Sequence, residues 1–276
     1  MSNQDSPRPV VVGIDGSDAA IATAQWAAKE AVHQDVPLRL VYVMQITEEP
    51  IASADAYPAD EEYAESALRA ARLAVEATGL PVKIDTAVLC EDVDSALIAE
   101  SKTATLVCLG SAGIGRVADR VLGSTATILA EYAQCPVAII RRFGDGPVPE
   151  GGFIAVVVND QPGNHEVMQW AMEEARVRRA PVLALRVGRC WGHFEIGDKQ
   201  FCQCLDTWLR RYPDVEVEVA ATRLNLARYL EGYLGAVQLV VISTEDVHWV
   251  PQLVGPEGLP IFAHADCSVL IVRDAG

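Results

Sequence analysis

The first half of the chain alternates short, almost entirely apolar runs with longer segments in which apolar residues recur every three to four positions. The apolar runs are rich in Val, Ile and Leu and lie at Pro9–Asp15, Pro37–Met44, Val82–Leu89, Thr105–Gly110 and Pro136–Arg141. Strands of this composition are typical of a parallel sheet covered by helices on both faces, with right-handed crossovers. The helices are expected at Ala19–Gln34, Glu61–Thr78, Asp92–Ser101 and Ser124–Ala133. The pattern therefore predicts an α/β domain with a doubly wound, five-stranded parallel sheet.

The same pattern returns in the second half of the chain. The segment from Trp26 to Ala31 recurs from Trp170 to Ala175, at a shift of 144 residues. Near the ends of the two halves, Gln134–Arg141 matches Asp266–Arg273 at a shift of 132. Self-similarity over this length indicates a duplicated domain.

The duplication predicts the organisation of the whole chain. Strands of the second copy are expected near 153–158, 181–187, 215–220, 238–242 and 268–272. A short last helix is expected around Leu259–Ala265, and a Gly- and Pro-rich stretch at 143–152 joins the copies. We therefore expect two tandem domains, at 1–146 and 147–276.

Composition and charge narrow the range of partners. The chain has 276 residues and a formal charge of −16, with 11 basic against 21 acidic residues over 1–146 and 11 against 17 over 147–276. Neither half offers the basic surface that nucleic acid or an anionic membrane attracts. No apolar run approaches the roughly 20 residues of a membrane helix, and the first residues lack the pattern of a signal peptide. We expect a cytoplasmic protein that binds neither nucleic acid nor membrane.

The seven cysteines are odd in number and scattered, which favours reduced thiols in the cytosol over a disulfide framework. One cluster, Cys190, His193, Cys202 and Cys204, contains residue types that can bind zinc. The last two lie on a predicted helix, where residues two apart point about 200° away from each other. Core packing is therefore the favoured interpretation, and no metal site is predicted.

The candidate chemistry lies where the first-half strands end, because open parallel sheets bind ligands beyond the carboxyl ends of their strands. The first strand ends at Asp15, the second at Val43 and Met44, and the fourth continues into a Gly-rich segment, 110–125. Glycines let the backbone approach a ligand, and the segment opens a helix whose free N–H groups favour a phosphate. With Arg116 and Arg120 against Asp119, the segment carries a net charge of +1 on an otherwise acidic protein. We expect an anion to bind there.

Two familiar phosphate-binding motifs do not fit these glycines. A Walker loop requires a lysine after its last glycine, and none is present. A dinucleotide fingerprint follows the first strand and opens directly into a helix, whereas Gly113-Ile-Gly115 follows the fourth strand. Glycines that only form turns in a surface loop remain an alternative on spacing alone.

The segment resembles the nucleotide-binding loop of the universal stress protein family. ATP-binding members carry Gly-x2-Gly-x9-Gly-Ser/Thr after the fourth strand, and this pattern is met by Gly110, Gly113, Gly123 and Ser124. The resemblance extends over both copies and implies a Rossmann-like fold in the tandem arrangement of actinobacterial members. It also implies a role in the stress response and ATP as the ligand, with Mg²⁺ as a companion of the phosphates.

By this resemblance, each matching position has an expected role. Asp15 and the main chain of Val43 would contact adenine and its surroundings. Gly110 and Gly113 would border the ribose and phosphates, and the phosphates would be held by Gly123, Ser124 and Thr125. An aspartate at the end of a strand often only caps the next turn, and this alternative stays open for Asp15.

The second copy departs from the pattern at nearly every one of these positions. Asn159 stands in place of Asp15, Ser243 in place of Gly110, and Glu245 and Asp246 bring two carboxylates that would repel phosphate. We interpret this copy as a degenerate domain without ATP. His248 and Trp249 nearby are a weaker candidate site for another ligand.

Three function classes follow from these observations. The favoured hypothesis is a regulatory module that binds ATP without turning it over, because no residue of the loop is placed to activate water. A slow ATPase and a scaffold that binds no nucleotide are the alternatives. The last strands of the two copies, Pro136–Arg141 and Ser268–Arg273, are expected at sheet edges and predicted to pair with each other within one chain. Association into a homodimer is left open by the sequence.

Overall fold

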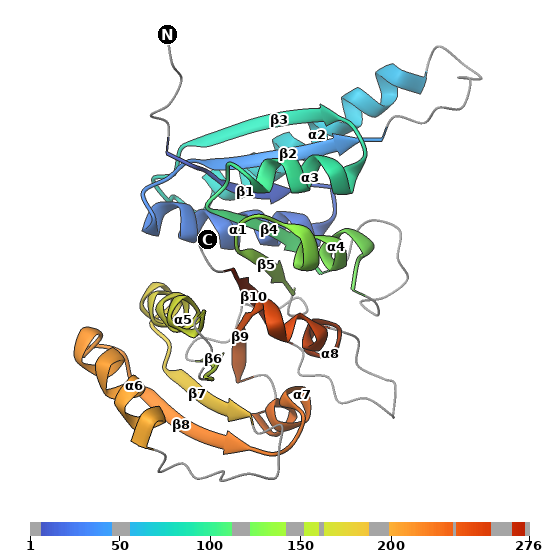
Figure 1. Ribbon diagram of the computed structural model, residues 1–276. Coiled ribbons are helices and arrows are strands. Elements are labelled where there is room, and N and C mark those ends of the chain that lie inside the picture. Colours follow the sequence, from blue (N-terminus) through green and yellow to red (C-terminus); the bar gives the residue numbers. More distant parts are fainter. Residues whose placement is uncertain are drawn as a thin grey trace. The chain divides into compact units, whose positions relative to one another are not determined.

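The computed structural model describes residues 7–45, 56–111, 122–141, 152–159, 163–187, 199–233, 236–254 and 267–273. The chain divides into two compact units, Met1–Arg142 and Phe143–Gly276 (Figure 1). Each unit is an α/β structure, as the alternation of apolar runs and helical segments predicts.

The first unit contains one parallel sheet with the strand order β3-β2-β1-β4-β5. The strands are β1 (Val10–Gly13), β2 (Leu38–Met44), β3 (Ile84–Cys90), β4 (Leu106–Gly110) and β5 (Val137–Ile140). The helices between them are α1 (Asp18–His33), α2 (Ala56–Glu76), α3 (Val93–Ser101) and α4 (Ser124–Tyr132). The order runs outward from β1 in both directions, so the predicted doubly wound fold is confirmed.

Helices cover this sheet on both faces. Helices α1 and α2 pack against each other on one face, and α3 and α4 pack against each other on the other (Figure 1). Strands β1 and β4 lie between these layers and are almost completely buried. Strand β3 differs, because it stands at the edge of the sheet and leaves Asp85 and Thr86 exposed. The expectation that every strand is covered on both faces is therefore wrong for this edge.

The second unit repeats the arrangement, with the strand order β10-β9-β6-β7-β8. Its strands are β6 (Phe153–Val157), β7 (Val182–Val187), β8 (Val217–Thr222), β9 (Val237–Ser243) and β10 (Ser268–Val272). Its helices are α5 (Asn164–Arg178), α6 (Lys199–Arg211), α7 (Leu226–Leu230) and α8 (Val250–Val254), with the short 3₁₀ helices η1 (Glu231–Tyr233) and η2 (Thr244–Trp249). The last helix predicted around Leu259–Ala265 lies outside the described residues.

Strand register shows that the two units are copies of one fold. Val10 pairs with Leu38 in the first unit, and Ile154 pairs with Val182 in the second, so both partners are shifted by 144 residues. The pairing of β1 with β4 in the first unit also matches the pairing of β6 with β9 in the second. Val10 pairs with Leu106, and the equivalent residue Ile154 pairs with Leu239. Because a one-residue slip would turn every side chain to the other face, equal register means equal core positions.

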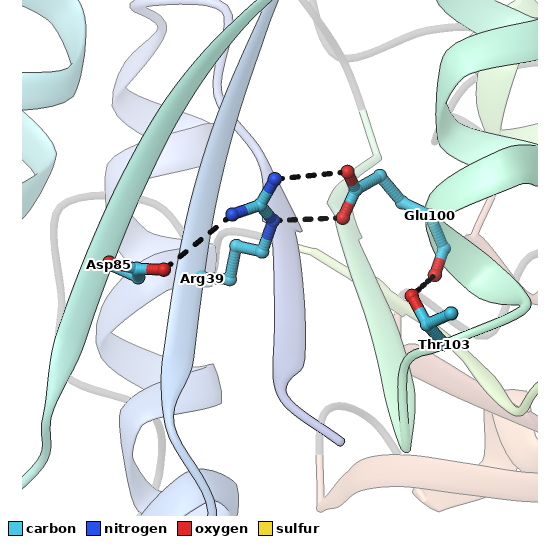
Figure 2. A network of polar contacts seen from close by, with 4 residues as sticks. All are labelled: Arg39, Asp85, Glu100 and Thr103. Atoms are coloured by element: carbon cyan, nitrogen blue, oxygen red, sulfur yellow. Dashed lines mark hydrogen bonds and ion pairs between the residues drawn. The ribbon is translucent and has the colours of Figure 1, made fainter. Parts of the chain in front are cut away.

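An ion-pair network links β2 and β3 to α3 (Figure 2). The Arg39 guanidinium donates to both carboxylate oxygens of Glu100, with N···O distances of 2.9 and 3.2 Å. It also lies 3.6 Å from the carboxylate of Asp85, and Thr103 donates to the Glu100 carbonyl. The hydrogen bond to Glu100 is the largest cause of the raised pKa of Arg39. Arg39 lies near the amino end of β2. The network therefore stabilises the side of the sheet opposite the carboxyl ends of the strands.

Two negative findings concern the described residues only. No helix in them is long and apolar enough to cross a membrane. No group of three or more His, Cys, Asp or Glu in these segments could hold a metal ion. Cys190 and His193 lie outside the described residues, so this finding does not extend to the candidate zinc cluster.

Candidate functional site

A cavity of about 240 Å³ opens at the carboxyl ends of β1, β2 and β4 in the first unit. The strand ends, the first turns of three helices and the loop after β4 all contribute to its wall. The lining residues are Gly13, Ile14, Asp15, Ser17, Ala20, Val41, Tyr42, Val43, Val93, Leu97, Leu109, Gly110, Gly123, Ser124, Thr125 and Ala126. This is the edge at which parallel α/β sheets bind ligands.

The end of β1 forms a tight turn that fixes Asp15 at the cavity. Gly16 has a φ of 88°, a conformation that side-chain-bearing residues rarely adopt. The Ser17 N–H donates to Oδ1 of Asp15 at 2.9 Å, and the Ser17 hydroxyl accepts from the Ala20 N–H to cap α1. Asp15 therefore forms the turn expected of an aspartate at a strand end, and it also lines the cavity.

The two ends of the loop after β4 lie side by side. The Ser111 N–H donates to the Ile140 carbonyl at 2.9 Å, which extends the pairing of β4 with β5 by one residue. The Ser111 carbonyl then accepts from the Gly123 N–H at 3.3 Å. Gly110 and Gly123, thirteen positions apart, consequently line the same cavity.

The amino end of α4 faces this cavity without a side-chain cap. Ser17 caps α1 and Asp92 caps α3 through side-chain oxygens, whereas the N-cap of α4 is Gly123, which has none. Ser124 and Thr125 add hydroxyl groups at the same point, and the first turn contains no acidic residue. Free N–H groups, the positive end of the helix dipole and hydroxyls together favour an anionic group.

Neither backbone conformation nor packing within the described chain requires a glycine at position 123. Its φ is −59°, which any residue adopts, and a Cβ built there would meet no atom within 4 Å. Gly13 is different, because a Cβ there would lie 2.6 Å from Cδ2 of Leu109. The position that a Cβ would occupy at Gly123 is thus free of described protein atoms.

Part of the cavity wall is apolar. It is formed by Val93 and Leu97 on one face of α3 and by Val41 and Leu109 from the sheet. Sequence reasoning missed this wall, although the spacing of four between Val93 and Leu97 does indicate one helix face. Asp15 carries the one formal charge among the lining residues, so the described wall has no basic group to neutralise an anion.

Six of the seven positions singled out in the sequence line this one cavity: Asp15, Val43, Gly110, Gly123, Ser124 and Thr125. The seventh, Gly113, lies outside the described residues, as do Arg116, Asp119 and Arg120. The positions come from three strand ends and one helix start, so the fold brings together residues that lie far apart in the sequence.

The equivalent edge of the second unit is built differently. Val157 stands where the first unit has Gly13, and Asn164 stands where it has Ala20. The Asn164 side chain is 5% exposed, and its amide donates to the Val157 carbonyl at 3.0 Å. Both positions of the second unit therefore carry a larger side chain than their counterparts in the first unit.

In the loop after β9 of the second unit, several side chains contact residues of the same loop. Asp246 is buried and accepts a hydrogen bond from the Ser243 hydroxyl at 3.2 Å. His248 is exposed and contacts the carbonyl of Glu245, and its ring lies 4.9 Å from that of buried Trp249. Among the described residues, these contacts of Ser243, Asp246 and His248 lie within one short segment.

Comparison with known proteins places the chain among proteins of one family. The model of the universal stress protein family matches residues 7–141. Universal stress protein Rv2624c of Mycobacterium tuberculosis is 44% identical over 275 residues, covering 99% of this chain and 100% of that protein. Rv2028c of the same organism is 39% identical over 281 residues, covering 99% and 98%.

A solved structure that matches the chain over nearly its whole length agrees on the fold. A universal stress protein from Archaeoglobus fulgidus DSM 4304 superposes with a TM-score of 0.69 at 13% identity, over 96% of both chains. Another universal stress protein, solved in complex with cAMP, aligns with 49% of this chain and 98% of its own length, at 26% identity and a TM-score of 0.40. With full-length relatives above 30% identity, the chain belongs to the universal stress protein family, in its tandem form.

Proposed function

We propose that the first unit binds ATP and that the protein acts as a nucleotide-dependent regulatory module of the stress response. The observation that carries this proposal is the cavity itself, which joins an apolar wall to an uncapped helix start bearing two hydroxyl groups. A nucleotide has the same division between a flat, largely apolar base and an anionic phosphate chain. The two kinds of surface in the cavity thus match the two parts of the ligand.

Charge sets the direction of the ligand in this proposal. The phosphates lie at the start of α4, where Ser124 and Thr125 supply hydroxyls and the helix supplies free N–H groups. The base lies toward Asp15 and the apolar wall, because a carboxylate there repels phosphate and accepts hydrogen bonds from amino groups. Gly110 and Gly113 border the middle of the ligand, and the main chain of Val43 contacts the base.

Binding without rapid turnover is the form of the proposal that the chemistry favours. Hydrolysis needs a group that activates water near the terminal phosphate. Asp15 is the one carboxylate that lines the described cavity, and its Oδ1 is engaged by the Ser17 N–H at the base end. In this proposal Mg²⁺ accompanies the phosphates as part of the ligand. A slow ATPase is the second candidate, and it would depend on Asp119.

The nucleotide carried by the native protein tests the proposal. The purified chain is denatured, and the released small molecules are separated and identified by their absorbance and mass. We expect an adenine nucleotide at up to one per chain, and we expect added ATP to raise the unfolding temperature of nucleotide-free protein. Absence of any bound nucleotide, together with an unfolding temperature that ATP does not change, would contradict the proposal and favour the scaffold interpretation.

A further inference from the structure

Tyr42 lines the cavity and has no place in the sequence pattern of the site. It lies in β2 directly before Val43 and is half-buried. Its ring packs edge-on against Tyr63 of α2, with ring centres 6.2 Å apart. Within the described part of the chain no hydrogen bond of the Tyr42 hydroxyl is found. The carboxylate of Asp15, which lines the cavity, is close enough to this hydroxyl to affect its pKa, so the hydroxyl is available as a ligand contact beside Asp15.

The electrostatic surroundings of this hydroxyl point to the neutral end of a ligand. Burial raises the pKa of Tyr42, and the neighbouring Tyr63, Asp15 and Asp60 raise it further. Tyr42 consequently stays protonated at neutral pH, and its hydroxyl can both donate and accept a hydrogen bond. The carboxylates of Asp15 and Asp60 repel a phosphate from this end of the cavity.

The second unit carries neither residue of this pair. At the shift of 144 residues, Arg186 replaces Tyr42 and Asn159 replaces Asp15. The backbone around them is unchanged, because Tyr42 pairs with Val88 and Arg186 pairs with Ala221, the corresponding residue of β8. The difference between the units at this position is thus one of side-chain chemistry.

We infer that Tyr42 is a further recognition residue of the cavity, whose hydroxyl contacts the base of the bound nucleotide, and that Tyr63 holds its ring in position. The inference rests on the proposed function, since it assigns the base end of the same site. Asp15 supplies acceptors only, whereas the edge of a purine base carries donors and acceptors. The Tyr42 hydroxyl adds the donor that Asp15 lacks.

Two ligands separate recognition of the base from recognition of phosphate. Unmodified protein and the Tyr42→Phe variant are titrated with ATP and with inorganic triphosphate, which has no base. Loss of one hydrogen bond should weaken ATP binding by roughly tenfold. Triphosphate binding should stay within about twofold, because the start of α4 is unchanged. Tyr132→Phe is the matched control, since it removes an exposed tyrosine hydroxyl of a residue that does not line the cavity, and its ATP affinity should not change.

Each outcome decides one statement. If the unmodified protein binds ATP and Tyr42→Phe binds it equally well, the inference on Tyr42 fails while the proposed function stands. If Tyr42→Phe loses ATP and triphosphate equally, or unfolds at a clearly lower temperature, Tyr42 has a structural role and the inference also fails. If the unmodified protein binds no nucleotide, the proposed function fails and the assignment of Tyr42 fails with it.

Discussion

Replacement of Gly123 should separate stability from binding more sharply than any other single change. A Cβ at this position meets nothing within 4 Å, and the φ of −59° suits any residue. Alanine is a poorer N-cap than glycine by about 0.5–1 kcal/mol. Restricting the unfolded chain by the same change stabilises the fold by about 0.4–1 kcal/mol. The two effects offset each other, so Gly123→Ala should shift the unfolding temperature by no more than about 2 °C.

Binding should respond much more strongly. In the proposed complex the phosphates approach the N–H groups at the start of α4, where the added methyl group projects into open space beside Gly123. We expect Gly123→Ala to weaken ATP by at least about tenfold, which corresponds to about 1.4 kcal/mol. Gly123→Glu adds a carboxylate next to the phosphates and should abolish binding.

Gly232 provides the matched control. It lies in η1 of the second unit, and a Cβ built on it also meets nothing within 4 Å. Gly232→Ala and Gly232→Glu should therefore be tolerated as well as the changes at Gly123 and should leave ATP affinity unchanged. Thermal unfolding measures the stability of all four variants, and equilibrium titration measures their affinity. Full ATP affinity in Gly123→Glu would refute the assignment of the phosphate site to α4.

Three further predictions concern turnover, the ion-pair network and alkaline pH. Phosphate release from ATP should stay below about one turnover per second, and sustained faster release that is lost in Asp119→Asn would favour the enzyme. Arg39→Ala should destabilise the chain by about 1–3 kcal/mol, because it leaves the mostly buried Glu100 unpaired; Asp85→Ala should cost under about 1 kcal/mol, since Asp85 is largely exposed. Equal losses in urea unfolding would contradict this ranking. Burial and the hydrogen bond to Glu173 raise the pKa of Tyr212 from 10.0 to about 12. Between these two pH values the folded protein keeps a proton that the unfolded chain loses, so the free energy of unfolding should fall as the pH rises from 10.0 to about 12. Tyr212→Phe should fall less steeply there, and an identical pH dependence in both proteins would show the shift to be absent.

The fold could be predicted from sequence because each local signal agrees with the tertiary structure. Apolar runs bounded by Gly and Pro predicted strands within a few residues of the observed ends, and the duplication predicted that the second half repeats them. The start of α2 was missed, since the helix begins at Ala56 and includes Pro58 in its first turn. Proline is tolerated there because the N–H of that turn has no partner within the helix. Sequence reasoning had placed the start after this proline.

Only part of the site could be predicted from the sequence. Positions that follow strand ends could be assigned to one edge from topology alone, and Asp15, Gly110 and Gly123 do line one cavity. The apolar wall from α3 and the place of Tyr42 depend on which helix packs over which strand. Strand pattern does not contain that information. The packing of Asn164 against Val157 in the second unit was missed for the same reason.

The stoichiometry of ATP binding tests the central claim most directly. Nucleotide-free, full-length protein is titrated calorimetrically with ATP, alongside Gly123→Glu as the protein that lacks the phosphate site. We expect one ATP per chain in the unmodified protein and none in the variant. Two ATP per chain would contradict the assignment of binding to the first unit alone, and no heat of binding in the unmodified protein would contradict nucleotide binding altogether.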